Sequence, residues 1–455
     1  MTLPAILDPF AKGAAATVMV RMALEWLIDH DALDHLFDVT AQSQYTRELT
    51  LGHLVDLMLD VAAGIRPSPR AAFAARHEQL HVSAAAFYGK LNRMELAVTA
   101  AVVEHTAARA RSVIEESGGA LDEPVPGYAA RILDGDVLSG TEHRIAPLRR
   151  TRAAGLPGKA LAVYEPTTEL VLQYVPCEDA YTQERALLDQ VRIEAGELWI
   201  ADRNFCERKF LFSIAAKSAY FLVRRHKSTL PFEPQGDLRR VGRTDTGEVF
   251  EHEVRVKEPD GDGVHVLRRI VLVLDQPTRD GDREIELVTN LPSSVAATTC
   301  CEAYRGRWQI EGHFQKLTEL LDCEVPSLGQ PLAALFAFGM SLVASHALAV
   351  LKASLRTAHG EEPVGELSHD LLVDEVSHVY RGMMLAVPAS HWGFLRTYTA
   401  AELAATLNEV AARVPVDRMR RARRGPKKPR NTPTTPHRHR STKRLLDLER
   451  ERRPP

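Results

Sequence analysis

The segment from Tyr304 to Phe314, YRGRWQIEGHF, places a phenol, a guanidinium and a carboxylate at helical spacing. Tyr304, Arg307 and Glu311 stand at positions i, i+3 and i+7, so one helix would align them on one face. Arginine binds phosphate through two N–H groups, so this face suits a phosphate-bearing substrate. Apolar residues predict that another side of the helix packs against a core: Trp308, Ile310, Phe314, Leu317 and Leu321.

Two further acids follow apolar runs that are predicted as strands, Asp134 in ILDGD and Asp202 in IADRNF. A buried carboxylate is costly unless it is paired or binds a cation. Carboxylates without Cys or His neighbours prefer Mg²⁺ or Mn²⁺, and two such ions about 4 Å apart can activate a water or a 3′-hydroxyl at a phosphodiester. Asp134, Asp202 and Glu311 are therefore candidate catalytic residues and ligands of two Mg²⁺ (or Mn²⁺) ions.

Two alternatives to this metal site stay open. Asp136 is a rival first ligand, because strand alternation would put it on the same face as Asp134. We favour Asp134 because it directly follows the apolar run ARIL. The chain also has 60 acidic residues, so some stand at strand ends by chance, and Tyr304, Arg307 and Glu311 could form a surface ion-pair patch.

The amino-terminal region, residues 14–115, shows apolar positions three and four apart and is predicted to be helical. Ser83 is suited to cap a helix that begins at Ala84. With a turn at 79–82 this gives a helix-turn-helix; the alternative is one more helix of a bundle. Lys90 and Arg93 are candidate DNA-binding residues on this helix.

After residue 119 the pattern changes to strand, strand, strand, helix, strand, helix, strand, which indicates a mixed sheet covered by helices. Three strand-like runs separated by Asp-Gly turns follow between residues 227 and 291 and predict an antiparallel insertion. Helices are expected again up to residue 413. The apolar stretch 331–351 carries Ser341, Ser345 and His346 and is interpreted as a buried core helix instead of a membrane span.

Charge is distributed unevenly along the chain. Residues 418–455 hold fifteen Lys or Arg and three acids, a balance of +12, which leaves −15 for the rest of a chain of net charge −3. With its prolines this tail is predicted to be a disordered basic arm that binds DNA non-specifically through counterion release. The five cysteines form no C-x-x-C pair and no basic n-region opens the chain, so we expect a protein of the reducing cytoplasm.

Three motifs resemble those of the insertion-sequence-four family of transposases. ILDGDVLSGTEHR is similar to the family's first-Asp motif, LWIADRNF to its second-Asp motif, and YRGRWQIEGHFQKL to its Tyr, Arg-Trp and Glu signature. The motifs occur in the family's order, and a strand-rich insertion separates the second Asp from the Glu. The resemblance covers roughly residues 14–400.

The resemblance implies an α/β fold: a ribonuclease-H-like mixed sheet flanked by helices, with an N-terminal all-helical domain and an antiparallel β insertion before the helix of the catalytic Glu. The expected domains are a helical DNA-binding domain (1–117), the first part of the core (125–226), the β insertion (227–291), the helical second part of the core (292–413) and the basic disordered tail (418–455).

The implied activity is that of a bacterial DDE transposase, which cuts its element's ends and joins the 3′-hydroxyls to target DNA. Asp134, Asp202 and Glu311 would be the metal ligands, and Tyr304, Arg307 and Arg203 would contact DNA. The expected partners are terminal inverted repeats and a target duplex, bound by a homodimer in the cytoplasm, in association with the nucleoid and with no membrane.

The chain also departs from the family pattern. Thr318 stands where the family has a Lys seven residues after the Glu. Lys316 is the nearest cation, but it is rotated by roughly 140° from Glu311 on a helix, so it is a weak DNA-binding candidate. Some members of the family stack a flipped DNA base on a Trp of the insertion when they form a hairpin. No Trp lies in the insertion of this chain, so the resemblance does not imply hairpin formation here. An inactive DNA-binding regulator and a metal-dependent nuclease that does not join DNA remain the alternatives.

Overall fold

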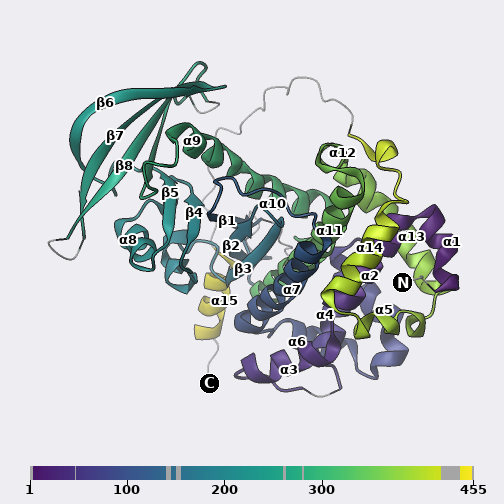
Figure 1. The fold of residues 1–455 in the computed structure, drawn as a ribbon. Helices are drawn as coiled ribbons and strands as arrows, with labels where there is room; N and C mark the ends of the chain where they lie inside the picture. Colours follow the sequence, from purple (N-terminus) through teal and green to yellow (C-terminus); the bar gives the residue numbers. More distant parts are fainter. Residues whose placement is uncertain are drawn as a thin grey trace.

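The computed structural model describes residues 4–46, 48–139, 145–149, 155–259, 263–278, 281–421 and 441–452. A twisted sheet lies beside a large group of helices, and a long β-ribbon extends from the sheet away from those helices (Figure 1).

The sheet has nine strands in the order β3-β2-β1-β4-β5-β9-β8-β7-β6. The pairs β1–β4 and β4–β5 are parallel, and the other pairs are antiparallel. This mixed sheet with flanking helices fits the predicted ribonuclease-H-like architecture. The strands are β1 (Ala129–Leu138), β2 (Gly158–Glu165), β3 (Leu170–Cys177), β4 (Glu197–Ala201), β5 (Tyr220–Arg224), β6 (Glu233–Thr244), β7 (Gly247–Lys257), β8 (Val264–Leu274) and β9 (Glu284–Thr289).

The helices come from both ends of the chain and from the connections between strands. They are α1 (Asp8–Gly13), α2 (Ala15–Leu27), α3 (His30–Thr40), α4 (Leu51–Ala62), α5 (Pro69–Leu80), α6 (Ala84–Leu91), α7 (Leu96–Ser117), α8 (Arg208–Ala216), α9 (Ala297–Gly306), α10 (Trp308–Leu320), α11 (Pro331–His359), α12 (Glu361–Gly365), α13 (His369–Ala386), α14 (Ala400–Ala411) and α15 (Thr442–Glu451).

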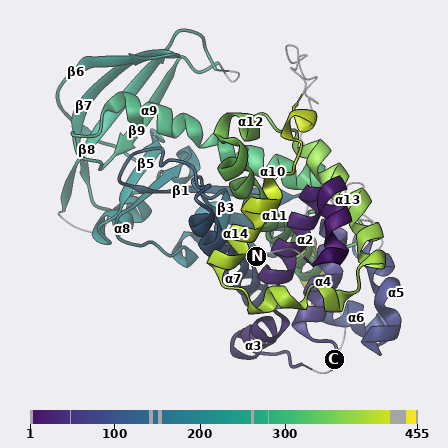
Figure 2. The same cartoon turned by 45° about the vertical axis from the view of Figure 1, so that its right-hand side comes forward.

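The central strands are buried on both faces because successive side chains point to opposite sides of the sheet. Ile132 of β1 and Ile200 of β4 belong to the core beneath the helices, whereas Leu133 and Ala201 belong to the core on the other face. The short α8 lies by that second face (Figures 1 and 2). Strand alternation therefore fixes which face of the sheet each neighbouring residue reaches.

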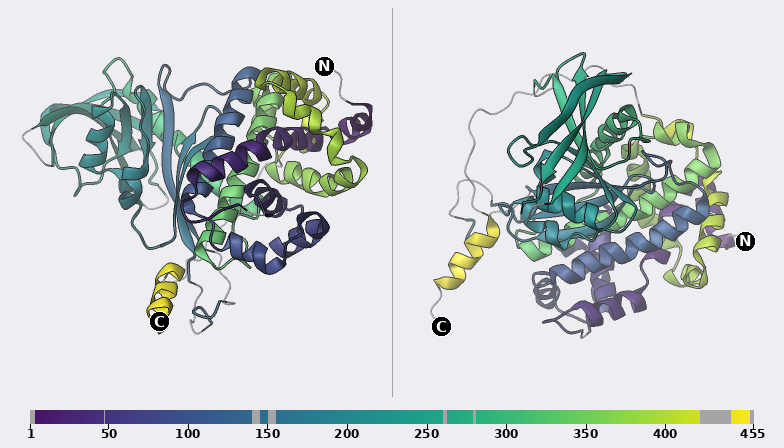
Figure 3. Two further views of the ribbon diagram at one scale, coloured as in Figure 1. Left: turned by 90° about the horizontal axis from the view of Figure 1, so that it is seen from below. Right: turned by 60° about the vertical axis from the view of Figure 1, so that its left-hand side comes forward.

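The apolar helix predicted at 331–351 is α11, and it is the centre of the helical region. It packs against α2, α4, α7 and α14 and against β2 and β3 of the sheet. Among the described helices it is the one that is long and apolar enough to cross a membrane, and 94% of its most apolar window is buried inside the structure. N-terminal and C-terminal helices thus share one apolar core around α11. Views from below and from the side show the two sets of helices interleaved (Figure 3).

The insertion contains one strand more than the sequence predicted. β6 pairs with β7 at the edge of the sheet, and nearly all of its residues are exposed. An exposed edge strand needs no apolar alternation, so the periodicity that reveals a half-buried strand is missing. The other three runs correspond to β7, β8 and β9.

Three local predictions were wrong. The predicted strand AARILDGDVL is β1, but Asp134 does not stand at its end, because residues 134–138 also pair with β2. The helix expected near residues 180–191 is a 3₁₀ helix, Glu184–Gln190. The single helix expected around Arg307 is two helices, α9 and α10, which meet at that residue while its backbone stays helical.

The end of the basic tail also departs from the prediction of a disordered arm. Ser441 caps α15, and this helix holds two of the tail's cations against acids of the body. Lys443 pairs with Glu178 at 3.0 Å, and Arg444 pairs with Asp179 at 2.7 Å. Figure 3 shows α15 apart from the other helices. Residues 422–440 and 453–455 of the tail lie outside the described residues.

Candidate active site

Two of the predicted acids lie on adjacent parallel strands. The register of β1 and β4 pairs Ile132 with Ile200 and Leu133 with Ala201. Asp134 and Asp202 come next on their strands, and alternation places them on the same face as the two isoleucines. That face is the one on which α10 packs against β1. The predicted strand-end position of Asp202 is confirmed, because β4 ends at Ala201.

Arg307 connects the first and the third acid. Its guanidinium donates to Asp134 Oδ2 at 3.0 Å and to Glu311 Oε1 at 2.7 Å. The Arg307 side chain is 7% exposed, that of Asp134 16% and that of Glu311 38%. The junction between α9 and α10 therefore directs a buried cation at the strand that carries Asp134.

The electrostatics of Asp134 identify a shared acidic site. Its pKa is raised to about 7, mainly by burial; Arg307 and the Gly135 N–H act in the lowering direction, and the charges of Asp202 and Glu311 act in the raising direction. Asp202 accepts the Asn204 N–H at 2.7 Å as the cap of a short 3₁₀ helix, Arg203–Phe205. The three predicted acids are thus electrostatic neighbours, although they come from distant parts of the sequence.

Asp136 lies in different surroundings. Burial raises its pKa to about 6, and its acidic neighbours are Glu184 and Glu324. Arg307 pairs with Asp134 and Glu311 and has no ion pair with Asp136 among the described residues. The geometry therefore favours Asp134 over Asp136 as the member of the site on β1.

The donor set of the site consists of carboxylates, which suits a hard divalent cation. In the described ranges, no group of three or more His, Cys, Asp or Glu side chains is close enough together to hold a metal ion. The positive partner of Asp134 and Glu311 in this arrangement is Arg307. The residue types fit a metal site, and the side chains would have to move closer to form one.

Beside Arg307, two aromatic residues border an open cavity of about 480 Å³ between α9 and the insertion. Tyr304 is buried, and burial raises the pKa of its phenol. The prediction that Trp308 belongs to the apolar side was wrong, because the residue is 61% exposed, and the Arg307 guanidinium lies 5.3 Å from the centre of its ring. The other four apolar residues of that side are buried: Ile310, Phe314, Leu317 and Leu321.

The remaining predicted DNA-binding residues lie in several places. Arg203 is exposed next to Asp202; the pKa of Asp282 in the insertion is lowered mainly by its hydrogen bond with Arg224, and the charge of Arg203 adds to this. Lys316 is not with the acids but lines a second cavity on the opposite side of α10. Thr318 donates to the Phe314 carbonyl at 3.1 Å within its own helix, a bond that serves the helix and not a ligand.

In the amino-terminal region the predicted Ser83 cap is confirmed, since its hydroxyl accepts the Ala86 N–H at the start of α6. The preceding helix α5 ends at Leu80, so the turn is slightly later than predicted. Lys90 is not presented to DNA: its ammonium donates to the Leu49 carbonyl and lies 4.7 Å from the centre of the Phe37 ring. Arg93 is exposed beyond the end of α6.

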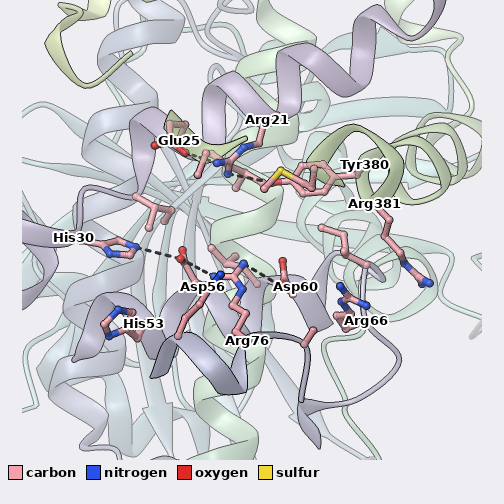
Figure 4. A pocket seen from close by; sticks show the side chains of 18 of the residues that line it. Arg21, Glu25, His30, His53, Asp56, Asp60, Arg66, Arg76, Tyr380 and Arg381 are labelled. Atoms are coloured by element: carbon pink, nitrogen blue, oxygen red, sulfur yellow. Dashed lines mark hydrogen bonds and ion pairs between the residues drawn. The ribbon is translucent and has the colours of Figure 1, made fainter. Parts of the chain in front are cut away.

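A polar cavity of about 610 Å³ lies away from the acids, between α2, α4, α5 and α13 (Figure 4). Its charged side chains pair with one another in its wall. Arg76 bridges Asp56 at 2.8 Å and Asp60 at 3.0 Å, and Asp56 also accepts from His30 at 3.2 Å. This network ties α3, α4 and α5 together, which is a structural role that sequence spacing did not predict.

Comparison with known families agrees with this geometry. Residues 126–324 match the family model described as "Transposase DDE domain". The matched span contains Asp134, Asp202, Arg307 and Glu311. A search of curated proteins found no match to the chain. The resemblance is supported at the level of a DDE transposase, and membership of the insertion-sequence-four family stays a prediction. Residues 126–324 are therefore similar to a transposase DDE domain, and this similarity supports a transposase function for the chain.

Proposed function

We propose that the chain is the transposase of a bacterial insertion sequence, which cleaves the ends of its element and joins their 3′-hydroxyls to target DNA. One observation carries the proposal: within the span that matches the transposase domain, Arg307 joins Asp134 of β1 to Glu311 of α10, and Asp202 directly follows the end of β4, the strand paired with β1.

The cofactor of this reaction would be a pair of Mg²⁺ or Mn²⁺ ions held by Asp134, Asp202 and Glu311. When bound, such ions activate the attacking oxygen and stabilise the leaving oxygen of a phosphodiester. Asp134 belongs to β1 and Asp202 directly follows β4, whereas Glu311 belongs to a helix next to a junction. A small rotation of α10 would therefore bring Glu311 toward the two aspartates.

Arg307 would exchange its carboxylate partners for a DNA phosphate during the reaction. A guanidinium binds a phosphate through two parallel N–H bonds, as it binds a carboxylate. Arg203, which is exposed, directly follows Asp202, and Tyr304 precedes Glu311 by seven residues; both would contact the DNA backbone near the cut end. Lys316 has no part in this proposal because it faces a different cavity.

The proposed partners are the terminal inverted repeats and a target duplex, with two chains acting together in the bacterial cytoplasm. The N-terminal helices would read the repeats through exposed residues of the α5–α6 region such as Arg93, since base contacts and not phosphate contacts carry sequence information. The basic tail would add non-specific affinity for DNA.

The test uses pre-cut duplex ends with free 3′-hydroxyls, taken from the DNA that flanks the gene, together with a supercoiled target plasmid and Mg²⁺. A transposase joins the ends to the plasmid. A nuclease that cannot join leaves only nicked or linear plasmid, and an inactive regulator shifts the ends in a gel without product. Either of the last two outcomes contradicts the proposal.

A further inference from the structure

A cavity of about 280 Å³ lies behind α10, between that helix, α11, the start of α13 and the turn after β2. We call it the basic pocket and define it by Lys316, Lys352, His313, His369 and Glu169, which line it. Residues 309, 312, 313 and 316 of α10 face this pocket, and at 100° per residue they lie on the side of the helix away from Glu311. The basic pocket is therefore separate from the acidic site.

Positive charge exceeds negative charge in this pocket. Its one carboxylate, Glu169, already pairs with both Lys352 and Arg356. The charge of Arg421 also acts on Lys316 and His369. Among the residues that line the pocket, Lys316 and Lys352 against Glu169 leave an excess of one positive charge, beside the imidazoles of His313 and His369.

Lys316 has no counter-ion within the described part of the chain. Among the described residues, none forms a hydrogen bond or an ion pair with its ammonium, although the side chain is only partly exposed. A partly buried ammonium without a partner is costly, and a bound anion would offset that cost. Burial and the neighbouring charge of Lys352 lower the pKa of Lys316 to about 8. Burial alone lowers the pKa of Lys352 to about 7.

The start of a long helix adds to the positive potential. α13 has 18 residues and begins at His369, which lines the basic pocket. The first N–H groups of a helix carry partial positive charge and favour an anion. Two ammonium groups and this helix end converge from three different elements, an arrangement that suits the several oxygens of one tetrahedral anion.

We propose that the basic pocket binds a phosphate group, which Lys316 and Lys352 hold at the N-terminus of α13. The group comes either from a free anion or from the 5′-phosphate of a DNA end, since both present the same tetrahedral oxyanion. A phosphate bound there contacts α10, α11 and α13 at once. It therefore restricts the movement of α10, the helix that carries Glu311, from the side opposite to that residue. The inference does not depend on the proposed function, because it concerns binding alone.

The test is isothermal titration calorimetry of the full-length protein with sodium sulfate at pH 8 in two buffers of different ionisation enthalpy. Sulfate has the shape and charge of the phosphate group but does not titrate in this range, so any proton that the buffer gives up on binding is taken up by the protein. We expect saturable binding with uptake of a fraction of a proton, because the bound anion raises the pKa of Lys316 and Lys352. Lys316→Met should weaken binding by about tenfold or more, and Lys316→Arg should retain most of it.

Lys217→Met is the matched control, because Lys217 is an exposed lysine at the end of α8 and faces no cavity of this kind. Its binding should change by less than about twofold. A second arm compares short duplexes with a 5′-phosphate and a 5′-hydroxyl. A preference for the 5′-phosphate that Lys316→Met removes assigns the ligand to DNA, whereas sulfate binding without that preference assigns it to a free anion. No saturable binding in either arm, or equal binding by the Lys316→Met and Lys217→Met proteins, overturns the proposal.

Discussion

One side of α10 carries an excess of negative charge and the other an excess of positive charge. The two sides differ in how far these charges are paired with opposite charges. On the side facing β1, Arg307 neutralises Asp134 and Glu311. On the other side Lys316 has no counter-ion among the described residues, and Glu169 is shared between Lys352 and Arg356. On the acidic side Asp134 and Glu311 are compensated by Arg307, whereas in the basic pocket Lys316 is not compensated by any described residue.

The two sites therefore differ in whether a ligand must displace an existing ion pair in order to bind. A compensated site can fold without its cation but must give up an ion pair to accept one, so Arg307 competes with any metal at Asp134 and Glu311. An uncompensated site loses nothing when an anion enters and gains a counter-ion. The protein alone should therefore be stabilised by Arg307 on one side of the helix and destabilised by Lys316 on the other.

The largest expected effect is a loss of activity that distinguishes Asp134 from Asp136, two aspartates of the same strand. Asp134→Asn should reduce DNA cleavage and joining by at least about a hundred- to a thousandfold, the loss typical of removing one preorganised stabilising group. Asp136→Asn is the matched control, because it removes a buried β1 carboxylate that does not contact Arg307, and it should cost less than about tenfold. Rates of joining measured with pre-cut ends decide this, and the reverse ranking would make Asp136 the ligand.

Next in size is the loss of the compensating cation. Arg307→Met leaves Asp134 buried without its counter-ion, which should lower the free energy of unfolding in EDTA by about 2 to 3 kcal/mol. Arg305→Met, two residues away and exposed, should change it by less than about 0.5 kcal/mol. Urea unfolding at pH 8 measures both variants. Equal stability of the two would mean that the acidic side is not compensated by Arg307.

The third prediction is a gain in folding stability, and it depends on pH. The pKa of Asp134 is about 7 in the folded protein and near 4 when unfolded. Its stabilising contribution is complete below pH 4 and is lost as the pH rises through 7. Asp134→Asn stays neutral, so without metal it should be more stable than the wild type by on the order of 2 kcal/mol at pH 8, and no more stable at pH 4.

Unfolding midpoints of the Asp134→Asn protein and the wild type between pH 4 and pH 8 test this difference. If Asp134→Asn stabilised the protein equally at pH 4 and at pH 8, the burial of the Asp134 charge would not be the cause of the gain.

The smallest effect concerns the basic pocket. The folded-state pKa of Lys316, about 8, lies below its ordinary value of 10.5, so its charge costs stability below pH 8 and that cost vanishes above pH 10.5. Lys316→Met should therefore stabilise the anion-free protein by about 1 kcal/mol at pH 7 and by less at pH 10. Thermal unfolding in chloride buffers measures it. A destabilised variant at pH 7 would mean that the Lys316 ammonium is paired with a stabilising partner in the folded protein.

Much of the acidic side could be predicted from the sequence, because its residues stand in motifs and at the ends of regular elements. Apolar runs ending in Asp located Asp134 and Asp202, and helical spacing located Arg307 and Glu311. Their meeting could not be derived from spacing alone, because it depends on the β1–β4 register and on the α9–α10 junction. The orientation of Trp308 was missed for the same reason, since the change of helix at Arg307 is a tertiary effect.

The basic pocket could not be predicted. Lys316, Lys352 and His369 come from three helices without a shared motif, and each has the spacing of an ordinary surface or core position. Lys90 differs from prediction in the other direction. It was predicted to contact DNA from a recognition helix, but its ammonium donates to the Leu49 carbonyl inside the protein. A sequence shows which side chains are charged, but the packing of helices decides whether a charge meets solvent, a partner or a ligand.

The central claim is that Asp134, Asp202 and Glu311 form one metal site, and it can be tested without knowing the element's DNA. Fe²⁺ takes the place of Mg²⁺, and with ascorbate and peroxide it cleaves the protein chain close to where it is bound; mass spectrometry maps the cuts. We predict cuts near Asp134, Asp202 and Glu311 that excess Mg²⁺ suppresses and that Glu311→Gln abolishes at all three places together. Cuts confined to the surroundings of Asp136, Glu184 and Glu324, or cuts that Glu311→Gln leaves unchanged, would contradict the account.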